Sequence, residues 1–149
     1  MFKKHLTKYV SQVKSENYRI QGTKFVFPNC DLLIVNCYLP CDPQVVEHDY
    51  VELLTVLEDI RTLVEKSECD NLLFCGDWNT HFPRNTSHVQ IVQNFIEELG
   101  VTVFWSNPDN DPGHFIQDVD YTHTTVRNDV MYTSTVDHFI GSTPVYNNG

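Results

Sequence analysis

The chain has 149 residues, with 20 acidic and 10 basic side chains and a formal net charge of −10. This length is enough for one domain with a hydrophobic core, while the acidic balance argues against tight non-specific binding to DNA, where neutralisation of phosphates supplies most of the affinity. The charge suits a protein that uses a divalent cation to bridge its acidic groups to an anionic substrate, or one whose charge only keeps it soluble.

Five cysteines at irregular spacing, without a C-x-x-C pair, argue against a disulfide framework or a zinc site. The N-terminal residues lack the continuous apolar stretch of a secretory signal. No apolar run approaches the ~20 residues that a membrane span requires. We therefore expect an intracellular protein without membrane contact, and the sequence does not distinguish nucleus from cytoplasm.

In chain order, two strands are the first elements that the pattern predicts. Residues 1–17 are polar with scattered apolar positions, a spacing that permits a short helix. Residues 18–27 and 31–39 have strand character and flank a turn cluster, so we expect them to form a hairpin. The second of these strands is apolar on both faces, which is typical of a central strand in a sheet.

The clearest helix follows these strands. Asp42 is expected to be its N-cap and Pro43 its first residue, and the helix is expected to run to about Lys66. Its apolar positions repeat at intervals of four and three residues, at Val46, Tyr50, Leu53, Leu57, Ile60 and Val64.

The second half of the chain predicts one more helix among several strands. The short apolar run Leu72–Cys75 has the character of a buried strand. A helix is expected to begin near Ser87 and to end before Gly100, with inward positions at Ile91, Val92, Phe95, Ile96 and Leu99. Further strands are expected at residues 101–105, 121–126 and 135–140. This succession of strands and helices indicates a layered α/β domain.

The run Leu72–Cys75 ends abruptly in the polar sequence Gly76-Asp77-Trp78-Asn79. An apolar strand that delivers a carboxylate and a carboxamide at its C-terminal end is a common way to build a site. If the backbone stays extended, Asp77 and Asn79 point to the same side. The alternative is an Asx-type turn, because Asp and Asn favour turns through local hydrogen bonds.

Two other strand ends also carry polar groups. Asn36 and Tyr38 share one face of the strand at residues 31–39. Asp137 lies within the strand at residues 135–140, where a carboxylate is costly to bury unless it is paired, hydrogen-bonded or near a metal. The alternative for Asp137 is an edge position that faces water.

Four segments, in this order along the chain, are similar to the motifs of one family. They are Val35–Pro40 (VNCYLP), Leu73–Asn79 (LFCGDWN), Tyr121–Thr124 (YTHT) and Ser134–Ser142 (STVDHFIGS). They resemble the N-x-Y-x-P, apolar-G-D-F/W-N, Y-T and S-x-I/L-D-H/Y elements of the endonuclease/exonuclease/phosphatase superfamily. Their phrasing is nearest to the endonuclease domains of non-LTR retrotransposons.

The resemblance implies a fold and a chemistry. The fold would be a layered α/β sandwich of two facing mixed sheets flanked by helices, in a single domain over residues 1–149 whose motif-bearing part is 18–142. The chemistry would be in-line attack of water on a phosphodiester, supported by Mg²⁺ or alternatively Mn²⁺. DNA would be the substrate, with no obligate protein partner, in a chain fused to or derived from a reverse-transcriptase polyprotein.

The resemblance also assigns catalytic roles to four residues. Asp77 would orient or deprotonate the attacking water, and Asn79 would hold the scissile phosphate. Tyr38 would contact the phosphate and stabilise its developing charge. Asp137 would orient a catalytic histidine, as a carboxylate orients imidazole in other hydrolytic sites.

Further roles implied by the resemblance concern substrate and metal. Asn36 and Thr122 would bind substrate, and Asp77 and Asn79 would be ligands of a second metal site.

The chain also departs from the family pattern. The family's metal-binding Glu of an N-terminal Q-E element has no counterpart, since the first 17 residues contain only Glu16 in a polar context, and its closing S-D-H element is missing. His138 adjoins Asp137 but is expected to point to the opposite face of the strand. We therefore expect a domain without its N- and C-terminal elements. The alternatives are a catalytically silent fragment or binding module, or a phosphatase or phospholipase of the same superfamily.

Overall fold

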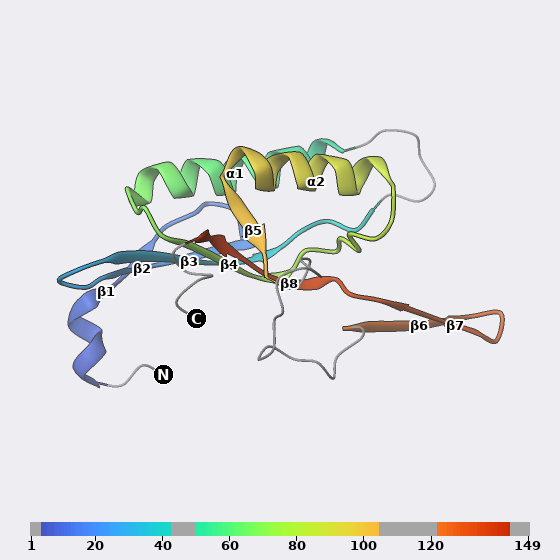
Figure 1. The fold of residues 1–149 in the computed structure, drawn as a ribbon, viewed down its shortest axis with the longest axis horizontal. Helices are drawn as coiled ribbons and strands as arrows, with labels where there is room; N and C mark the ends of the chain where they lie inside the picture. Colours follow the sequence, from blue (N-terminus) through green and yellow to red (C-terminus); the bar gives the residue numbers. More distant parts are fainter. Residues whose placement is uncertain (1–3, 43–49, 105–121, 144–149) are drawn as a thin grey trace.

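The chain folds into a mixed sheet with two helices, and the computed structural model describes residues 4–42, 50–104 and 122–143. The elements are η1 (Lys4–Tyr9), β1 (Val10–Val13), β2 (Ile20–Val26), β3 (Asp31–Tyr38), α1 (Val51–Ser67), β4 (Leu72–Asp77), α2 (Ser87–Glu98), β5 (Val101–Val103), β6 (His123–Arg127), β7 (Val130–Ser134) and β8 (Asp137–Ser142). Figure 1 shows the helices layered on one side of the sheet and the β6–β7 hairpin extending away from it.

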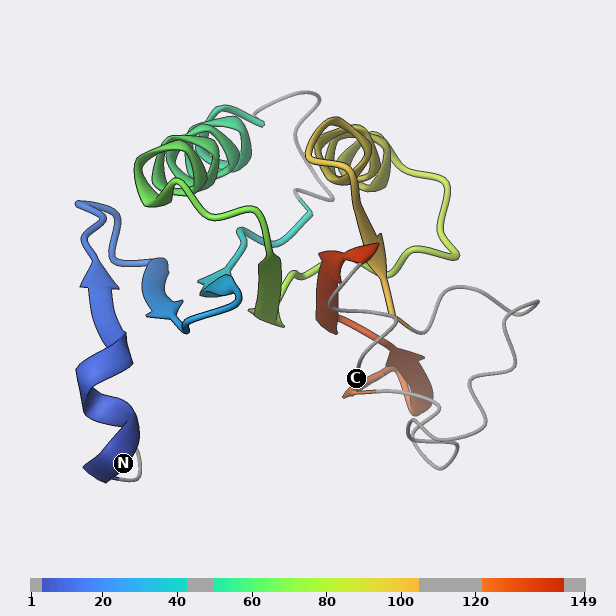
Figure 2. The same ribbon diagram turned by 60° about the vertical axis from the view of Figure 1, so that its left-hand side comes forward.

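Six strands form the main sheet in the order β1-β2-β3-β4-β8-β5. β3 and β4 are parallel, and the other neighbouring pairs are antiparallel. A parallel pair needs a crossover, and α1 lies in that connection. Figure 2 shows α1 and α2 over the same face of the sheet. The predicted α/β class, the β2–β3 hairpin and the central place of β3 are confirmed; β6 and β7 form a second, two-stranded sheet.

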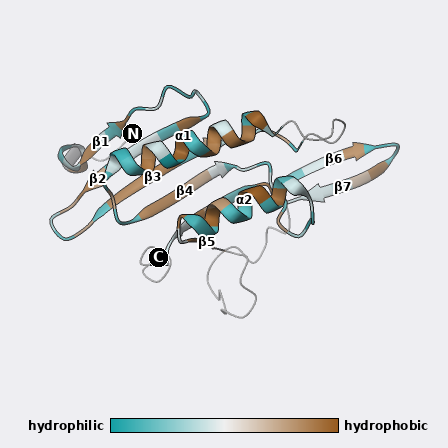
Figure 3. Cartoon of the chain, turned by 90° about the horizontal axis from the view of Figure 1, so that it is seen from above, coloured by the Kyte–Doolittle hydropathy of each residue, from teal (hydrophilic) through white to brown (hydrophobic). Residues whose placement is uncertain are grey.

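The hydrophobic core lies between the two helices and the sheet face beneath them. Completely buried side chains reach it from both layers, among them Leu33, Val35, Phe74, Ile60 and Val92. Figure 3 looks down through the helices onto the hydrophobic colour of β3 and β4. Alternate residues of these strands point away from the core, and that opposite surface, which we call the outer face, carries the polar strand ends.

The helix α1 is shorter than its pattern predicts. It begins at Val51, and Tyr50 at its N-cap position has φ −89° and ψ 11° and makes no capping hydrogen bond through its side chain. The expectation that Asp42 caps one continuous helix is therefore wrong, and residues 43–49 lie outside the described part. The apolar stripe is confirmed within the described helix at Leu53, Leu57 and Ile60, which are all buried.

The helix α2 matches its predicted bounds. Thr86 at the N-cap accepts a hydrogen bond from the backbone N–H of Val89 at 3.3 Å, which satisfies one of the free donors of the first turn. Gly100 follows the helix with φ +63°, the left-handed conformation that commonly ends a helix. None of the described helices has both the length and the apolar character needed to cross a membrane.

Two strands are present that the sequence pattern did not predict. β1 follows the short helix η1 and pairs with β2. β7 occupies residues that we expected to separate two strands, because the turn is confined to Asn128 and Asp129, with φ of 51° and 60°. Two consecutive residues with positive φ form the tight turn that suits a twisted hairpin. The strand predicted at residues 135–140 is β8, which begins at Asp137.

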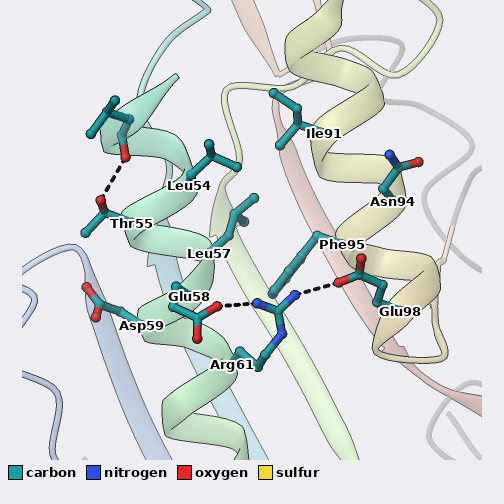
Figure 4. A pocket seen from close by; sticks show the side chains of 11 residues that line it. Leu54, Thr55, Leu57, Glu58, Asp59, Arg61, Ile91, Asn94, Phe95 and Glu98 are labelled. Carbon is teal, nitrogen blue, oxygen red and sulfur yellow. Dashed lines mark hydrogen bonds and ion pairs between the residues drawn. The ribbon is translucent and has the colours of Figure 1, made fainter. Parts of the chain in front are cut away.

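Arg61 of α1 joins the two helices through its side chain. Its guanidinium pairs with Glu58 of α1 and, at 2.5 Å, with Glu98 of α2, and it lies 5.7 Å from the ring centroid of Phe95. Figure 4 shows Arg61 spanning from Glu58 to Glu98 across the groove between the two helices. Because the pairs are exposed, they contribute little to stability, and the buried contacts beneath them hold the helices on the sheet.

We expect the substitution Ile60→Ala to lower the free energy of unfolding by about 2–5 kcal/mol, the usual cost of truncating a fully buried aliphatic side chain. The control is Leu54→Ala on the same helix, whose side chain is 53% exposed and whose truncation should cost less than about 0.5 kcal/mol. Urea denaturation of both variants measures the difference. Equal losses would contradict the core described above.

Candidate functional site

Three of the predicted catalytic residues lie side by side on the outer face. Tyr38 of β3 is the register partner of Asp77 of β4, and Asp77 is the register partner of Asp137 of β8. Register partners present their side chains on the same face of a sheet. The phenol of Tyr38 and the carboxylates of Asp77 and Asp137 therefore form one row across three strands, which we call the outer row. Asn36 lies two residues before Tyr38 and is exposed on the same face.

The chain turns immediately after Asp77. The backbone N–H of Asn79 donates to Asp77 Oδ1 at 2.9 Å, and Asn79 has φ +47°. This is the Asx-type turn that we considered as the alternative, so the extended backbone assumed for Asp77 and Asn79 is wrong. Asn79 is instead brought back toward β3, where its Nδ2 donates to the carbonyl oxygen of Leu39 at 2.7 Å.

Gly76 allows β3 and β4 to approach at the site. It has φ +121°, and a β-carbon there would lie 2.2 Å from the carbonyl oxygen of Cys37 and 2.9 Å from Oδ1 of Asn36. No side chain fits between these backbones. Because Gly76 has none, Asp77 can lie next to Tyr38 at the end of the parallel pair.

The side chain of Thr122 holds the backbone at Asp137 in place. The hydroxyl oxygen of Thr122 accepts the backbone N–H groups of Val136 at 2.9 Å and Asp137 at 3.1 Å. On its other side, the N–H of Trp78 donates to the carbonyl oxygen of Val136 at 2.8 Å. Asp137 is exposed, although β8 is an interior strand, because its side chain points to the outer face. The contacts of Thr122 orient the strand start, and its predicted role in substrate binding stays a prediction.

The electrostatics of the row depend on its two neighbouring carboxylates. Burial raises the pKa of the Asp77 carboxyl, the negative charge of Asp137 raises it further, and the hydrogen bond from Asn79 opposes the rise. Two neighbouring carboxylates repel each other unless a proton or a cation lies between them.

The oxygen donors present fit Mg²⁺ in chemical type. The carboxylates of Asp77 and Asp137 and the amide oxygens of Asn36 and Asn79 are the hard ligands that this ion prefers. Within the described ranges there is no group of three or more His, Cys, Asp or Glu side chains that forms a metal cluster. In proteins, Mg²⁺ bound by one or two carboxylates is completed by water and substrate phosphate.

His138 lies on the opposite face from Asp137, as predicted. It is 3% exposed, and its Nε2 lies 2.7 Å from the carbonyl oxygen of Thr80. Burial lowers its pKa, an effect that the bond to Thr80 and the charge of Asp137 oppose. This imidazole therefore contacts the loop after β4 and cannot interact with the side chains of the outer row.

The structure also adds residues that the sequence analysis did not assign to the site. Arg19 lies opposite Tyr38, because the N–H of Tyr38 donates to the carbonyl oxygen of Arg19 at 2.9 Å. A cavity of about 660 Å³ lies beside Asn79, and its lining includes Arg84, His123 and Arg127. The pairing of the β2–β3 hairpin is the sequence feature from which the position of Arg19 beside Tyr38 could have been predicted. No local sequence pattern predicts that Arg84, His123 and Arg127 line the same cavity.

Similar folds occur among proteins that process nucleic acids. The endonuclease domain of TRAS1, a telomere-specific non-LTR retrotransposon, is 17% identical with a TM-score of 0.66 over 93% of this chain and 58% of that one. The Neisseria 3′ phosphatase NExo, bound to a product DNA hairpin, is 14% identical with a TM-score of 0.61 over 90% of this chain and 56% of that one. An AP endonuclease from Archaeoglobus fulgidus is 16% identical with a TM-score of 0.58, over 93% and 59%.

These likenesses concern the fold. The chain spans less than three-fifths of the length of each of the three proteins. No family model matches the sequence, and no curated protein sequence matches it. What this chain does must therefore be argued from the residues of the outer row.

We expect Gly76→Ala to lower the free energy of unfolding by about 3 kcal/mol or more, because the new β-carbon combines an unfavourable φ with a clash against backbone. The matched control is Gly100→Ala, which also has positive φ but no atom within 4 Å of the added carbon and should cost only about 1–2 kcal/mol. Urea denaturation compares them, and equal costs would refute the close approach of β3 and β4.

The buried histidines predict the direction of a pH effect on stability. Burial lowers the pKa of His88 and His138 in the folded chain, so the unfolded chain, whose histidines titrate near about 6.5, binds more protons as the pH falls. Stability is therefore full above that value and decreases as the pH is lowered through it.

Urea denaturation between about pH 7.5 and 5.5 measures this slope, a range set by the ordinary histidine pKa. The slope should be reduced in His138→Gln, which keeps an N–H donor for Thr80. It should persist in His123→Gln, which leaves both buried histidines, His88 and His138, in place. A slope unchanged in His138→Gln would contradict the assignment.

Proposed function

We propose that this chain, which has the fold of the endonuclease/exonuclease/phosphatase superfamily, carries part of the active site of a metal-dependent phosphodiester hydrolase that acts on DNA, of the retroelement endonuclease type. The observation that carries the proposal is the row of Tyr38, Asp77 and Asp137, adjacent in register on one face. The same residues were selected by motif resemblance, without reference to their placement.

Asp77 is the candidate base for the attacking water. Its carboxylate lies beside Tyr38 and Asp137 in the row, and a positioned carboxylate can accept a proton from water as a general base. The hydrogen bond from the backbone of Asn79 to Oδ1 fixes the orientation of the carboxylate. The free lone pairs of Oδ2 are then the acceptor for a water proton.

Tyr38 and Asn79 are the candidate phosphate contacts. The Tyr38 side chain is 48% exposed, so its hydroxyl can donate to a non-bridging phosphate oxygen. One hydrogen of Asn79 Nδ2 is used on the carbonyl of Leu39, and a carboxamide carries a second. Mg²⁺ or Mn²⁺ held by Asp77 and neighbouring oxygens would neutralise charge on the phosphate.

Asp137 is proposed to orient an imidazole other than that of His138, which faces the core. A carboxylate that holds an imidazole fixes its tautomer and stabilises its charged form. Residues 1–149 are proposed to form one domain, in which the motif-bearing part is 18–142. The association with a reverse transcriptase is likewise a proposal, supported by the likeness to the retrotransposon domain.

One observation supports a second activity. The fold is also similar to a 3′ phosphatase bound to a DNA product, and the outer row has groups for a terminal phosphate as well as an internal one. A duplex with a 3′-phosphate end is therefore the second substrate to test, and release of inorganic phosphate distinguishes it from strand cleavage. A silent binding module is the remaining alternative, and it predicts no turnover of either substrate.

We expect purified protein to nick supercoiled plasmid with Mg²⁺ and not with EDTA. Asp77→Asn should reduce the rate by about 10²–10⁴-fold, the usual contribution of a positioned base. Asp70→Asn is the matched control, because Asp70 is exposed and precedes the opposite end of β4. Nicking that survives equally in both variants, or a folded wild-type chain that cleaves neither plasmid nor 3′-phosphate, would reject the proposed function.

A further inference from the structure

The side chain of Arg19 lies under the ring of Tyr38. Its guanidinium carbon is 4.9 Å from the centroid of the Tyr38 ring, and its Nη1 is 3.4 Å from the Tyr38 carbonyl oxygen. The Arg19 side chain is only 14% exposed, whereas Tyr38 is 48% exposed. The guanidinium carbon also lies 5.3 Å from the centroid of the Tyr18 ring, so the same cation contacts two tyrosine rings, of which the Tyr38 ring is the nearer.

Glu52 holds this guanidinium from the helix layer. Nε and Nη2 of Arg19 donate to the same oxygen, Oε1 of Glu52, at 3.0 and 2.7 Å. Glu52 belongs to the first turn of α1, so the contact joins the helix to the strand end that carries Tyr38. An ion pair with a partner as exposed as Glu52, at 59%, contributes little to stability. Its effect is on geometry, because it fixes where the planar guanidinium lies.

We infer that Arg19 is a positioning residue for Tyr38, fixing the orientation in which the phenol meets a phosphate group; the inference rests on the proposed function for its catalytic consequence. A half-exposed tyrosine at the end of a strand can occupy several rotamers. Stacking on an anchored guanidinium selects one of them. Reactions at a phosphate are sensitive to such placement, since small displacements of a contacting group reduce the rate strongly.

The charge of Arg19 alone does not explain its place. Glu52 offsets that charge, and three nitrogens of the guanidinium already point to Glu52 and to the Tyr38 carbonyl. A lysine keeps the charge but has neither the plane nor the fork of donors. Arg19→Lys should therefore behave like Arg19→Leu if positioning is the function, and like the wild type if charge is the function.

The first measurement does not require activity. The chain is made with 3-fluorotyrosine at position 38, and its fluorine NMR signal is compared with that of the Arg19→Leu and Arg19→Lys variants. Loss of the stacked, planar guanidinium should move and broaden the signal in both. The matched control is Arg61→Leu, which removes an arginine that also pairs with glutamate and lies near an aromatic ring, between α1 and α2. It should leave the signal unchanged. Urea denaturation verifies that every variant is folded.

The second measurement uses the plasmid-nicking reaction with Mg²⁺. Arg19→Leu should lower kcat on the order of tenfold to a hundredfold, with little change in KM. The same substitution should have almost no further effect in the Tyr38→Phe background, because residues that act as one unit are not additive. A merely structural role would give the same additional loss in both backgrounds.

These two measurements separate failure of the inference from failure of the proposed function. A fluorine signal that is unchanged in both Arg19 variants overturns the positioning role, whether or not the chain cleaves DNA. Equal losses of rate in the two Tyr38 backgrounds overturn it as well. If the wild type does not cleave, the proposed function fails, and the fluorine signal alone decides whether Arg19 fixes the ring.

Discussion

Between β3 and β4 the backbones approach so closely that only hydrogen fits at Gly76, where a β-carbon would lie 2.2 Å from a carbonyl oxygen. The parallel pair keeps one register up to its last residues, Tyr38 and Asp77. The Asx turn at Asn79 and the hydrogen bond from the Asn79 side chain to Leu39 both depend on this register, because they join the ends of the two strands. A shift by one residue would send Asp77 to the core side and replace it with an apolar side chain.

The second constraint on the row comes from the opposite strand. β8 approaches β4 from its other side, and Thr122 holds the start of β8 through two backbone amides. Asp137 is in this way aligned with Asp77 although 60 residues of chain separate them. The site is thus assembled from three strand ends. Each is fixed by backbone pairing in the sheet and by a side-chain contact, from Thr122 at β8, Asp77 at β4 and Asn79 at β3.

The periodicity of apolar residues and the residues typical of helix ends predicted much of this fold. The stripe through Leu53, Leu57 and Ile60 identified the core face of α1, and Thr86 and Gly100 mark where α2 begins and ends. The start of α1 was mistaken because Asp42 and Pro43 are strong local signals for a helix N-terminus. β7 was missed because its side chains are mostly exposed, and a strand outside the core leaves no apolar alternation in the sequence.

The candidate site was predictable for different reasons. Asp77 and Tyr38 stand in motifs short enough to be read locally, and their adjacency follows from strand register. Arg19 has no motif, and its place beside Tyr38 depends on the pairing of a whole hairpin. Asn79 shows the limit of alternation as a guide. The carboxylate of Asp77 accepts a hydrogen bond from the backbone of Asn79, so the chain turns at the end of β4 and the two side chains do not alternate as in a strand.

The strand β4 places its two groups of side chains in separate environments. Leu72, Phe74 and the following Trp78 face the helices and are buried, whereas Asp77 faces outward. Selection for folding and selection for chemistry therefore act on different residues of one segment. Under the proposed function, substitutions on the outer face can therefore change or abolish catalysis while the helix-covered face preserves the fold.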